Sequence, residues 1–247
     1  MIILLYLLVP LIAFLYACVG FGGATGYLAV MSIFGIAPQE MANSALVLNI
    51  LVAGISFISF FRAGHFRRDL LIPFLITSLP AAFFGGSIPV TDATYKILLY
   101  LALTFVAVRL LFFSRRQDDT RPLRPIPFAW AMIIGLGIGL LSGLVGIGGG
   151  IFLSPIIIFT RWGNPKQAAS VAAAFIVLNS ISGLAGRVAA GTFFLNEFSL
   201  SLIPFGVAGA LAGSIIGAQR LSGINIRRAL GTVMTLAVTN FWLTYWR

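Results

Sequence analysis

Charged residues are scarce in this chain, and cysteine and histidine are almost absent. Only 9% of the 247 residues are charged, whereas 60% are hydrophobic. One soluble core cannot bury that much apolar surface, so we expect lipid to surround the chain. Cys18 is the only cysteine, which excludes a disulfide framework and a cysteine-based metal site. His65 is the only histidine and lies in a basic loop, where it is expected to be solvated.

Carboxylates are missing from the middle of every apolar run. All six acidic residues fall at segment ends or in loops: Glu40, Asp69, Asp92, Asp118, Asp119 and Glu197. Carriers of Na⁺ or protons commonly hold an ionisable side chain at membrane depth, so a cation carrier is not expected. An enzyme would need a nucleophile with a base, or a metal cluster. We therefore expect no catalytic residues, no metal site and no cofactor.

Ten apolar runs follow one another along the chain, separated by short polar, glycine or proline breaks. They predict ten mostly helical segments at 2–19, 24–36, 39–61, 70–87, 93–113, 128–144, 150–160, 166–186, 198–218 and 229–246. Several reach the roughly 20 residues that a helix needs to cross the hydrocarbon core, but 24–36 and 150–160 are too short and are predicted half-helices. The first run lacks the basic start and cleavage site of a signal peptide, so we assign it to the mature chain.

The two halves of the chain repeat each other. Residues 19–45 read VGFGGATGYLAVMSIFGIAPQEMANSA and align with VGIGGGIFLSPIIIFTRWGNPKQAASVA at 145–172. The alignment matches Gly20 with Gly146, Gly22 with Gly148, Pro38 with Pro165 and Ala42 with Ala169. We therefore predict a first repeat at 1–113, a basic cytoplasmic linker at 114–127 and a second repeat at 128–247.

Basic residues indicate how the repeats are oriented, because Lys and Arg favour cytoplasmic loops. Inverted halves place 13 of the 16 basic residues on one side of the membrane, in loops at 62–69, 109–127, 161–166 and 219–228. Parallel halves would divide them 10 to 6. The sequence thus predicts an all-α polytopic membrane protein of two inverted five-segment repeats. Each repeat holds a glycine-tipped helical hairpin followed by three transmembrane helices, and both termini are predicted to be non-cytoplasmic.

Each hairpin turns at a glycine-rich tip directly before its half-helix. Non-helical backbone at membrane depth is tolerated only where protein buries it or where it lines a water-filled cavity. The first turn of the half-helix presents unpaired N–H groups and the positive end of the helix dipole, which together favour an anion. Two tips that enter from opposite faces would meet near the midplane, where broken-helix transporters commonly hold substrate.

The predicted substrate-binding residues are the tips and polar side chains near them. They are Gly22, Gly23, Ala24, Thr25, Asn43, Asn49, Gly148, Gly149, Gly150, Ser170 and Asn179. Asn43 and Ser170 hold the same position in the two repeats and could face each other over one ligand; capping of nearby backbone is the alternative. Arg187 is expected to be a snorkelling interfacial arginine, with attraction of the anion at a cavity mouth as the alternative.

Other glycines indicate close helix packing. Gly135, Gly139 and Gly143 recur every four residues, as do Gly209, Gly213 and Gly217, a spacing that is common where membrane helices touch. A dinucleotide-binding loop is a poor interpretation of GIGGG at 146–150. The stretch lacks a preceding strand, the G-x-G-x-x-G spacing and an acidic ribose partner.

The paired motifs resemble the sulfite exporter TauE/SafE family. They are GFGGATG, GIAPQEMANSA and FRAGHF in the first half, and GIGGGIFLSP, WGNPKQAASVAAA and GRVAAGTFF in the second. The resemblance covers essentially the whole chain and implies transport of sulfite or an organosulfonate such as sulfoacetate across a bacterial inner membrane. The first tip has Ala24 where the second has Gly150, which argues against exact symmetry of the two half-sites.

The expected function is secondary transport of a small oxyanion by alternating access. An anion channel would use the same site without closure, and a membrane enzyme acting on a lipid or phosphate ester is the more distant alternative. A net charge of +10 would suggest nucleic acid in a soluble protein, but here the basic residues lie almost wholly between apolar runs. The expected partners are a small anionic substrate and membrane lipid, without nucleic acid, and a homodimer is the assembly to test.

Overall fold

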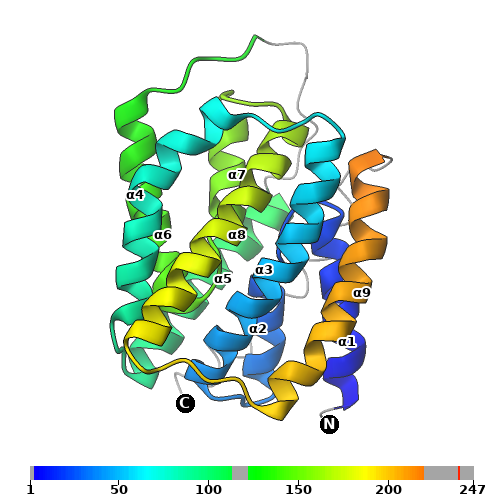
Figure 1. The fold of residues 1–247 in the computed structure, drawn as a ribbon, viewed down its shortest axis with the longest axis vertical. Helices are drawn as coiled ribbons and strands as arrows, with labels where there is room; N and C mark the ends of the chain where they lie inside the picture. The colour runs from blue at the N-terminus through cyan, green and yellow to red at the C-terminus, as the bar shows by residue number, and fades with distance from the viewer. Residues whose placement is uncertain (1–2, 113–121, 220–238, 240–247) are drawn as a thin grey trace.

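The computed structural model describes residues 3–112, 122–219 and 239, and these residues form helices joined by short loops (Figure 1). The helices are α1 (Ile3–Ala17), α2 (Ala24–Ile33), α3 (Pro38–Arg62), α4 (Arg68–Ser87), α5 (Asp92–Phe112), α6 (Phe128–Val145), α7 (Gly150–Phe159), α8 (Pro165–Ala189) and α9 (Glu197–Gln219). They match the first nine predicted segments closely. The predicted segment at 229–246, apart from Thr239, and the linker residues 114–121 lie outside the described residues.

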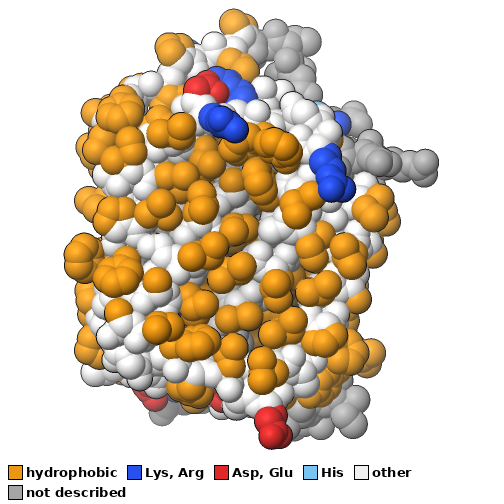
Figure 2. Space-filling model, in the orientation of Figure 1, with side chains coloured by type: hydrophobic (Ala, Val, Ile, Leu, Met, Phe, Trp, Pro, Cys, Tyr) orange, Lys and Arg blue, Asp and Glu red, His pale blue; other side chains and the backbone are white. Residues whose placement is uncertain are grey.

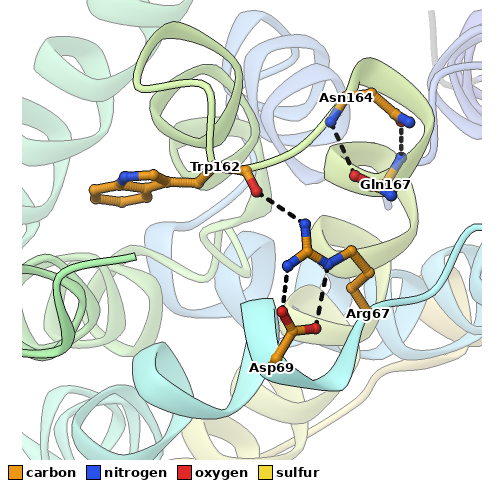
Figure 3. A network of polar contacts seen from close by, with 5 residues as sticks. All are labelled: Arg67, Asp69, Trp162, Asn164 and Gln167. Atoms are coloured by element: carbon orange, nitrogen blue, oxygen red, sulfur yellow. Dashed lines mark hydrogen bonds and ion pairs between the residues drawn. The ribbon is translucent and has the colours of Figure 1, made fainter. Parts of the chain in front are cut away.

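The two longest helices begin at matched prolines. Pro38 starts α3 and Pro165 starts α8, and each helix has 25 residues. Proline suits this position because the first N–H of a helix has no intrahelical partner. Asn164 strengthens the start of α8: its side-chain oxygen accepts from the N–H of Gln167 at 2.9 Å, and the Gln167 side chain accepts from the N–H of Asn164 at 3.0 Å (Figure 3). Such a capping box satisfies two N–H groups that would otherwise be unpaired.

Helix length separates the elements that can cross a membrane from those that cannot. Five described helices are long and apolar enough to cross, namely α3, α4, α6, α8 and α9. By contrast, α2 and α7 have 10 residues each, or about 15 Å of helix, half the hydrocarbon thickness. The two predicted half-helices are thereby confirmed as short helices. The described chain is a multi-pass, all-helical membrane protein.

Surface chemistry agrees with this assignment. Figure 2 shows hydrophobic side chains over most of one flank, with Lys and Arg gathered toward one end. The loops that join α3 to α4 and α7 to α8 lie at that end, the upper end of Figure 1. Arg67, in the first of these loops, donates to the carbonyl of Trp162 in the second loop at 3.2 Å and so links the two (Figure 3). It also forms an ion pair with Asp69 at the start of α4.

The halves of the chain interlock. The first helix of each hairpin packs against the fourth helix of the other half, α1 against α9 and α6 against α4, while α3 packs against α8. In Figure 1, α2 lies in the lower part of the molecule and α7 lies in the upper part. The two short helices therefore approach the middle of the molecule from opposite ends.

The predicted glycine packing is confirmed in both interlocking pairs. A Cβ atom on Gly135, Gly139 or Gly143 of α6 would come within 2.1–2.3 Å of a carbonyl oxygen of α4. A Cβ atom on Gly209 or Gly213 of α9 would come within 2.1–2.2 Å of a carbonyl oxygen of α1, and one on Gly217 would lie 2.1 Å from the carbonyl oxygen of Cys18, directly after α1. Real Cβ atoms do not approach oxygen so closely, so glycine alone lets these backbones touch.

Replacement of Gly139 by Ala tests this packing. Its Cβ atom would lie 2.3 Å from the carbonyl oxygen of Ser78, so the helices must separate, and overpacking of this kind costs about 1–3 kcal/mol. Gly137→Ala is the matched control, since Gly137 lies in the same helix and its Cβ atom would meet nothing within 4 Å. Thermal unfolding in detergent should show a loss for Gly139→Ala and none for Gly137→Ala. Equal behaviour of the two variants would contradict the close approach of α4 and α6.

Candidate functional site

Two buried turns form the tips of the hairpins, the first tip at residues 18–23 and the second tip at residues 146–149. Each ends on a left-handed glycine that serves as N-cap, Gly23 with φ 91° before α2 and Gly149 with φ 79° before α7. Glycine adopts this conformation without the penalty that a side chain imposes. It also brings no side-chain cap, so the first N–H groups of α2 and α7 are left for other partners.

Each tip lies against the long helix of the other half. A Cβ atom on Gly20 would lie 2.8 Å from the Cβ atom of Ala169 in α8. The matched contact joins Gly146 to α3, where a Cβ atom would lie 3.0 Å from the Cα atom of Ala42. The residues that align between the repeats thus meet reciprocally, and each hairpin is held by backbone contact with the opposite half.

Asn49 joins the two tips. It is fully buried near the middle of α3. Its side-chain oxygen accepts from the backbone N–H of Ala24, the first residue of α2, at 3.2 Å. Its side-chain nitrogen donates to the carbonyl of Ile147 in the second tip at 3.1 Å. Because an N–H can only donate and a carbonyl can only accept, these partners fix the orientation of the amide.

Ile176 holds the position of Asn49 in the second repeat. A Cβ atom on Gly150, the first residue of α7, would lie 2.5 Å from Cγ1 of Ile176, and one on Gly22 would lie 3.1 Å from its Cγ2. Ile176 therefore faces α7 as Asn49 faces α2, but its side chain cannot form a hydrogen bond. The two half-sites, each defined as a tip with the first turn of its short helix, differ in chemistry.

Two buried hydroxyl groups lie beside the tips without a hydrogen-bond partner among the described residues. The Tyr27 hydroxyl lies 2.7 Å from the position of a Cβ atom on Gly23, and the Ser180 hydroxyl lies 3.0 Å from that of one on Gly148. A buried hydroxyl without a partner costs free energy, so these groups point to a ligand. The sequence prediction did not include Tyr27. Its position four residues after Gly23 was the available signal, because helical side chains lean toward the N-terminus.

Several predicted site residues bond to the protein itself. Thr25 shares a hydrogen bond of 2.7 Å with the hydroxyl of Tyr16, which links α2 to α1. Asn179 donates to the carbonyl of Phe175 one turn earlier at 2.9 Å, while its side-chain oxygen has no partner among the described residues. Ser170 is fully buried, and its hydroxyl likewise lacks a described partner.

Asn43 and Ser170 are not brought together, so the expectation that they face each other over one ligand is wrong. The side-chain nitrogen of Asn43 donates to the carbonyls of Thr192 at 3.1 Å and Phe194 at 3.2 Å, beyond the end of α8. Ser170 lies in the second turn of α8, about 28 Å of helix from that end. Asn43 therefore binds backbone of the other half of the chain, and not the nearby backbone that the alternative interpretation named.

Arg187 is also different from the expectation, because it does not snorkel. Only 7% of its surface is exposed, and its Nη2 atom donates to the carbonyls of Gly143 at 3.1 Å and Leu144 at 3.0 Å. The Tyr95 hydroxyl donates to the next carbonyl, that of Val145, at 3.0 Å. Together these side chains satisfy the last carbonyls of α6 directly before the second tip, a role that favours a cation.

The two unpartnered hydroxyls beside the tips are uncharged, whereas Arg187 brings a cation to the end of α6 directly before the second tip. The four acidic residues in the described part of the chain, Glu40, Asp69, Asp92 and Glu197, all occupy first turns of helices. Among the described residues, no three His, Cys, Asp or Glu side chains lie close enough together to hold a metal ion. His65 lies in the loop after α3, where partial burial and the Lys166 ammonium lower its pKa. Backbone N–H and hydroxyl groups can bind an anion by hydrogen bonding but cannot neutralise its charge.

Comparison with known proteins gives consistent similarities. The family described as "Sulfite exporter TauE/SafE" matches residues 5–241. A "probable membrane transporter protein" of Sinorhizobium fredii is 34% identical over 229 residues, which cover 92% of each chain. Another protein with that description, from Methanocaldococcus jannaschii, is 27% identical over 250 residues, which cover 92% of this chain and 88% of the relative. No solved structure matches the chain.

Replacement of Gly148 by Ala tests the packing of the second tip. Gly148 has φ +78°, and its Cβ atom would lie 2.6 Å from the side-chain nitrogen of Asn49. Gly191→Ala is the matched control, because Gly191 has φ +68° but open space within 4 Å. In both variants a side chain in the left-handed conformation lowers the free energy of unfolding by about 1–2 kcal/mol. Overpacking should lower it by about 1–3 kcal/mol more in Gly148→Ala. Equal losses in thermal unfolding would show that the tips do not pack around Asn49.

Proposed function

The chain belongs to the sulfite exporter TauE/SafE family, and we propose that it is a secondary carrier for a small oxyanion. It is a membrane transporter of that family and not an enzyme. The proposed substrate is sulfite or an organosulfonate such as sulfoacetate, and the proposed location is the bacterial inner membrane. The family and the repeated sequence motifs support this choice of substrate.

One observation carries the proposal: in the buried interior, Asn49 bonds both to the first residue of α2 and to Ile147 in the second tip, directly before α7. The first turn of a helix presents N–H groups and the positive end of a dipole, the ordinary setting for a bound anion. The unpartnered hydroxyls of Tyr27 and Ser180 add one donor beside each tip. A pyramidal oxyanion such as sulfite offers several acceptor oxygens and could bond to donors from both tips.

Alternating access fits the way in which the halves are joined. We assign the chain two inverted repeats, with both termini outside the cytoplasm and the basic linker inside it. The division of basic residues supports this orientation, as do short helices that approach the middle from opposite ends. Movement of one hairpin against the other half would open the site to one side while the second hairpin closes the other.

The charge of the substrate would cross the membrane uncompensated. No carboxylate lies near the tips in the described chain, and the Arg187 guanidinium before the second tip is held by the carbonyls of Gly143 and Leu144, so it does not move with the substrate. Each elementary charge that crosses gains or loses about 2.3 kcal/mol per 100 mV of membrane potential. A potential that is negative inside the cell would therefore drive the anion outward, which is the direction of export.

Flux through proteoliposomes tests the proposal. The purified protein should carry sulfite with a rate that saturates, depends steeply on temperature and responds to an imposed membrane potential. His65→Ala should transport like the unmodified protein, because the lowered pKa keeps this loop histidine neutral near pH 7 and no step uses it. Absence of flux, together with absence of saturable stabilisation by sulfite, sulfonates or other oxyanions, would contradict the proposal. Flux that rises linearly without saturation would indicate a channel.

A further inference from the structure

The side-chain oxygen of Asn49 makes the contact that a bound oxyanion would make at α2. It accepts from the N–H of Ala24 at 3.2 Å, and Ala24 is the first helical residue after the left-handed N-cap Gly23. Anions bind at helix N-termini through this kind of acceptor contact. The α2 half-site is therefore filled by a side chain of the protein itself.

A second, independent feature points to a ligand at the same place. The Tyr27 side chain is fully buried, and its hydroxyl has no hydrogen-bond partner among the described residues. It lies over the N-cap, 2.7 Å from the position of a Cβ atom on Gly23. Asn49 thus satisfies one donor of this half-site and leaves the Tyr27 donor unsatisfied. An oxyanion, with more than one acceptor oxygen, could satisfy both.

We propose that Asn49 is an internal competitor for the transported oxyanion, which displaces the amide from the N-terminus of α2. This role rests on the proposed transport function. Asn49 acts as a positioning residue here, because it holds the half-site closed until the substrate replaces it. The predicted substrate contacts at α2 are then the N–H of Ala24 and the hydroxyl of Tyr27.

Displacement would also separate the tips. The nitrogen of the same amide donates to the carbonyl of Ile147 in the second tip. A fully deprotonated oxyanion, such as a sulfonate or the sulfite dianion, can replace the amide oxygen, but it cannot replace the nitrogen, because it has no proton to donate. Its charge also repels the Ile147 carbonyl oxygen. Binding at α2 therefore breaks the link between the tips, which couples occupancy to movement of one hairpin against the other.

The matched residue of the second half-site differs. Ile176 takes the matched place beside Gly150 and Gly22, and its side chain cannot compete for an N–H group. The oxyanion therefore meets the Asn49 amide at α2, whereas Ile176 offers it no competing acceptor at α7. The two half-sites thus differ at two matched positions. The first half-site has Ala24 and Asn49 where the second has Gly150 and Ile176, and only Asn49 can close its half-site by hydrogen bonding.

Asn49→Ala gives the sharpest test, because competition and direct contact predict opposite signs. Removal of a competitor frees the N–H of Ala24, so sulfite should bind roughly three- to tenfold more tightly, the range expected for one hydrogen bond. A residue that only contacts substrate, or only supports the fold, would weaken binding when truncated. Calorimetric titration of the full-length protein in detergent with sodium sulfite measures the change, and thermal unfolding verifies that the variant is folded.

Three further variants complete the experiment. Ile176→Ala removes a side chain from the matched position without freeing an N–H group, so it should produce no tightening. Asn49→Asp keeps an acceptor for Ala24 but adds a negative charge beside it, so sulfite binding should fall more than tenfold. Tyr27→Phe conserves volume and removes one donor, so binding should weaken roughly three- to tenfold.

The outcomes separate this proposal from the transport function. Tighter binding by Asn49→Ala but not by Ile176→Ala supports internal competition. Unchanged or weaker binding by a folded Asn49→Ala variant overturns it, as does equal tightening by both variants, because the gain would then come from added space. Absence of saturable binding of sulfite, sulfonates and other oxyanions by the unmodified protein would instead contradict the proposed function.

Discussion

Backbone polar groups at membrane depth must find their hydrogen bonds inside the protein, because the lipid core offers none. This requirement applies most strongly at the two tips, because the backbone of each hairpin is not helical there and its polar groups lack helical partners. Arg187 and Tyr95 satisfy the last carbonyls of α6 before the second tip. Asn49 satisfies one group in each half-site, the N–H of Ala24 and the carbonyl of Ile147. The hydroxyls of Tyr27 and Ser180 lie beside the tips without a described partner, and each can donate to an anion.

Close helix contact supplies the rigid frame around these turns. Glycines bring α6 onto α4 and α9 onto α1 at backbone distance, so the first helix of each hairpin is fixed to the opposite half. The tips themselves lie on α3 and α8 through Ala42 and Ala169. A hairpin that moves must therefore carry part of the other half with it, and small changes at Asn49 can be transmitted to whole helices.

Much of this arrangement could be predicted from the sequence, because apolar run length and paired glycine motifs report directly on helices and turns. Proximity within the site could not. Alignment of the two repeats shows which residues are equivalent, but it does not show which equivalent residues lie close together. Asn43 and Ser170 lie near the starts of α3 and α8, and the structure places them far apart. Asn49 and Ile176 lie near the middle of the same helices, and both contact each tip. The burial of Arg187 could not be predicted either, because its sequence neighbours do not reveal that the end of α6 lies beside it.

The central claim, that an oxyanion binds between the two tips, is tested most directly with selenite, a heavier analogue of sulfite. Crystals of the protein soaked in selenite should give an anomalous difference peak within hydrogen-bonding distance of the Ala24 nitrogen and the Tyr27 hydroxyl. A peak elsewhere, for example beside the basic loops, would contradict the account. So would the absence of a peak at selenite concentrations that saturate transport.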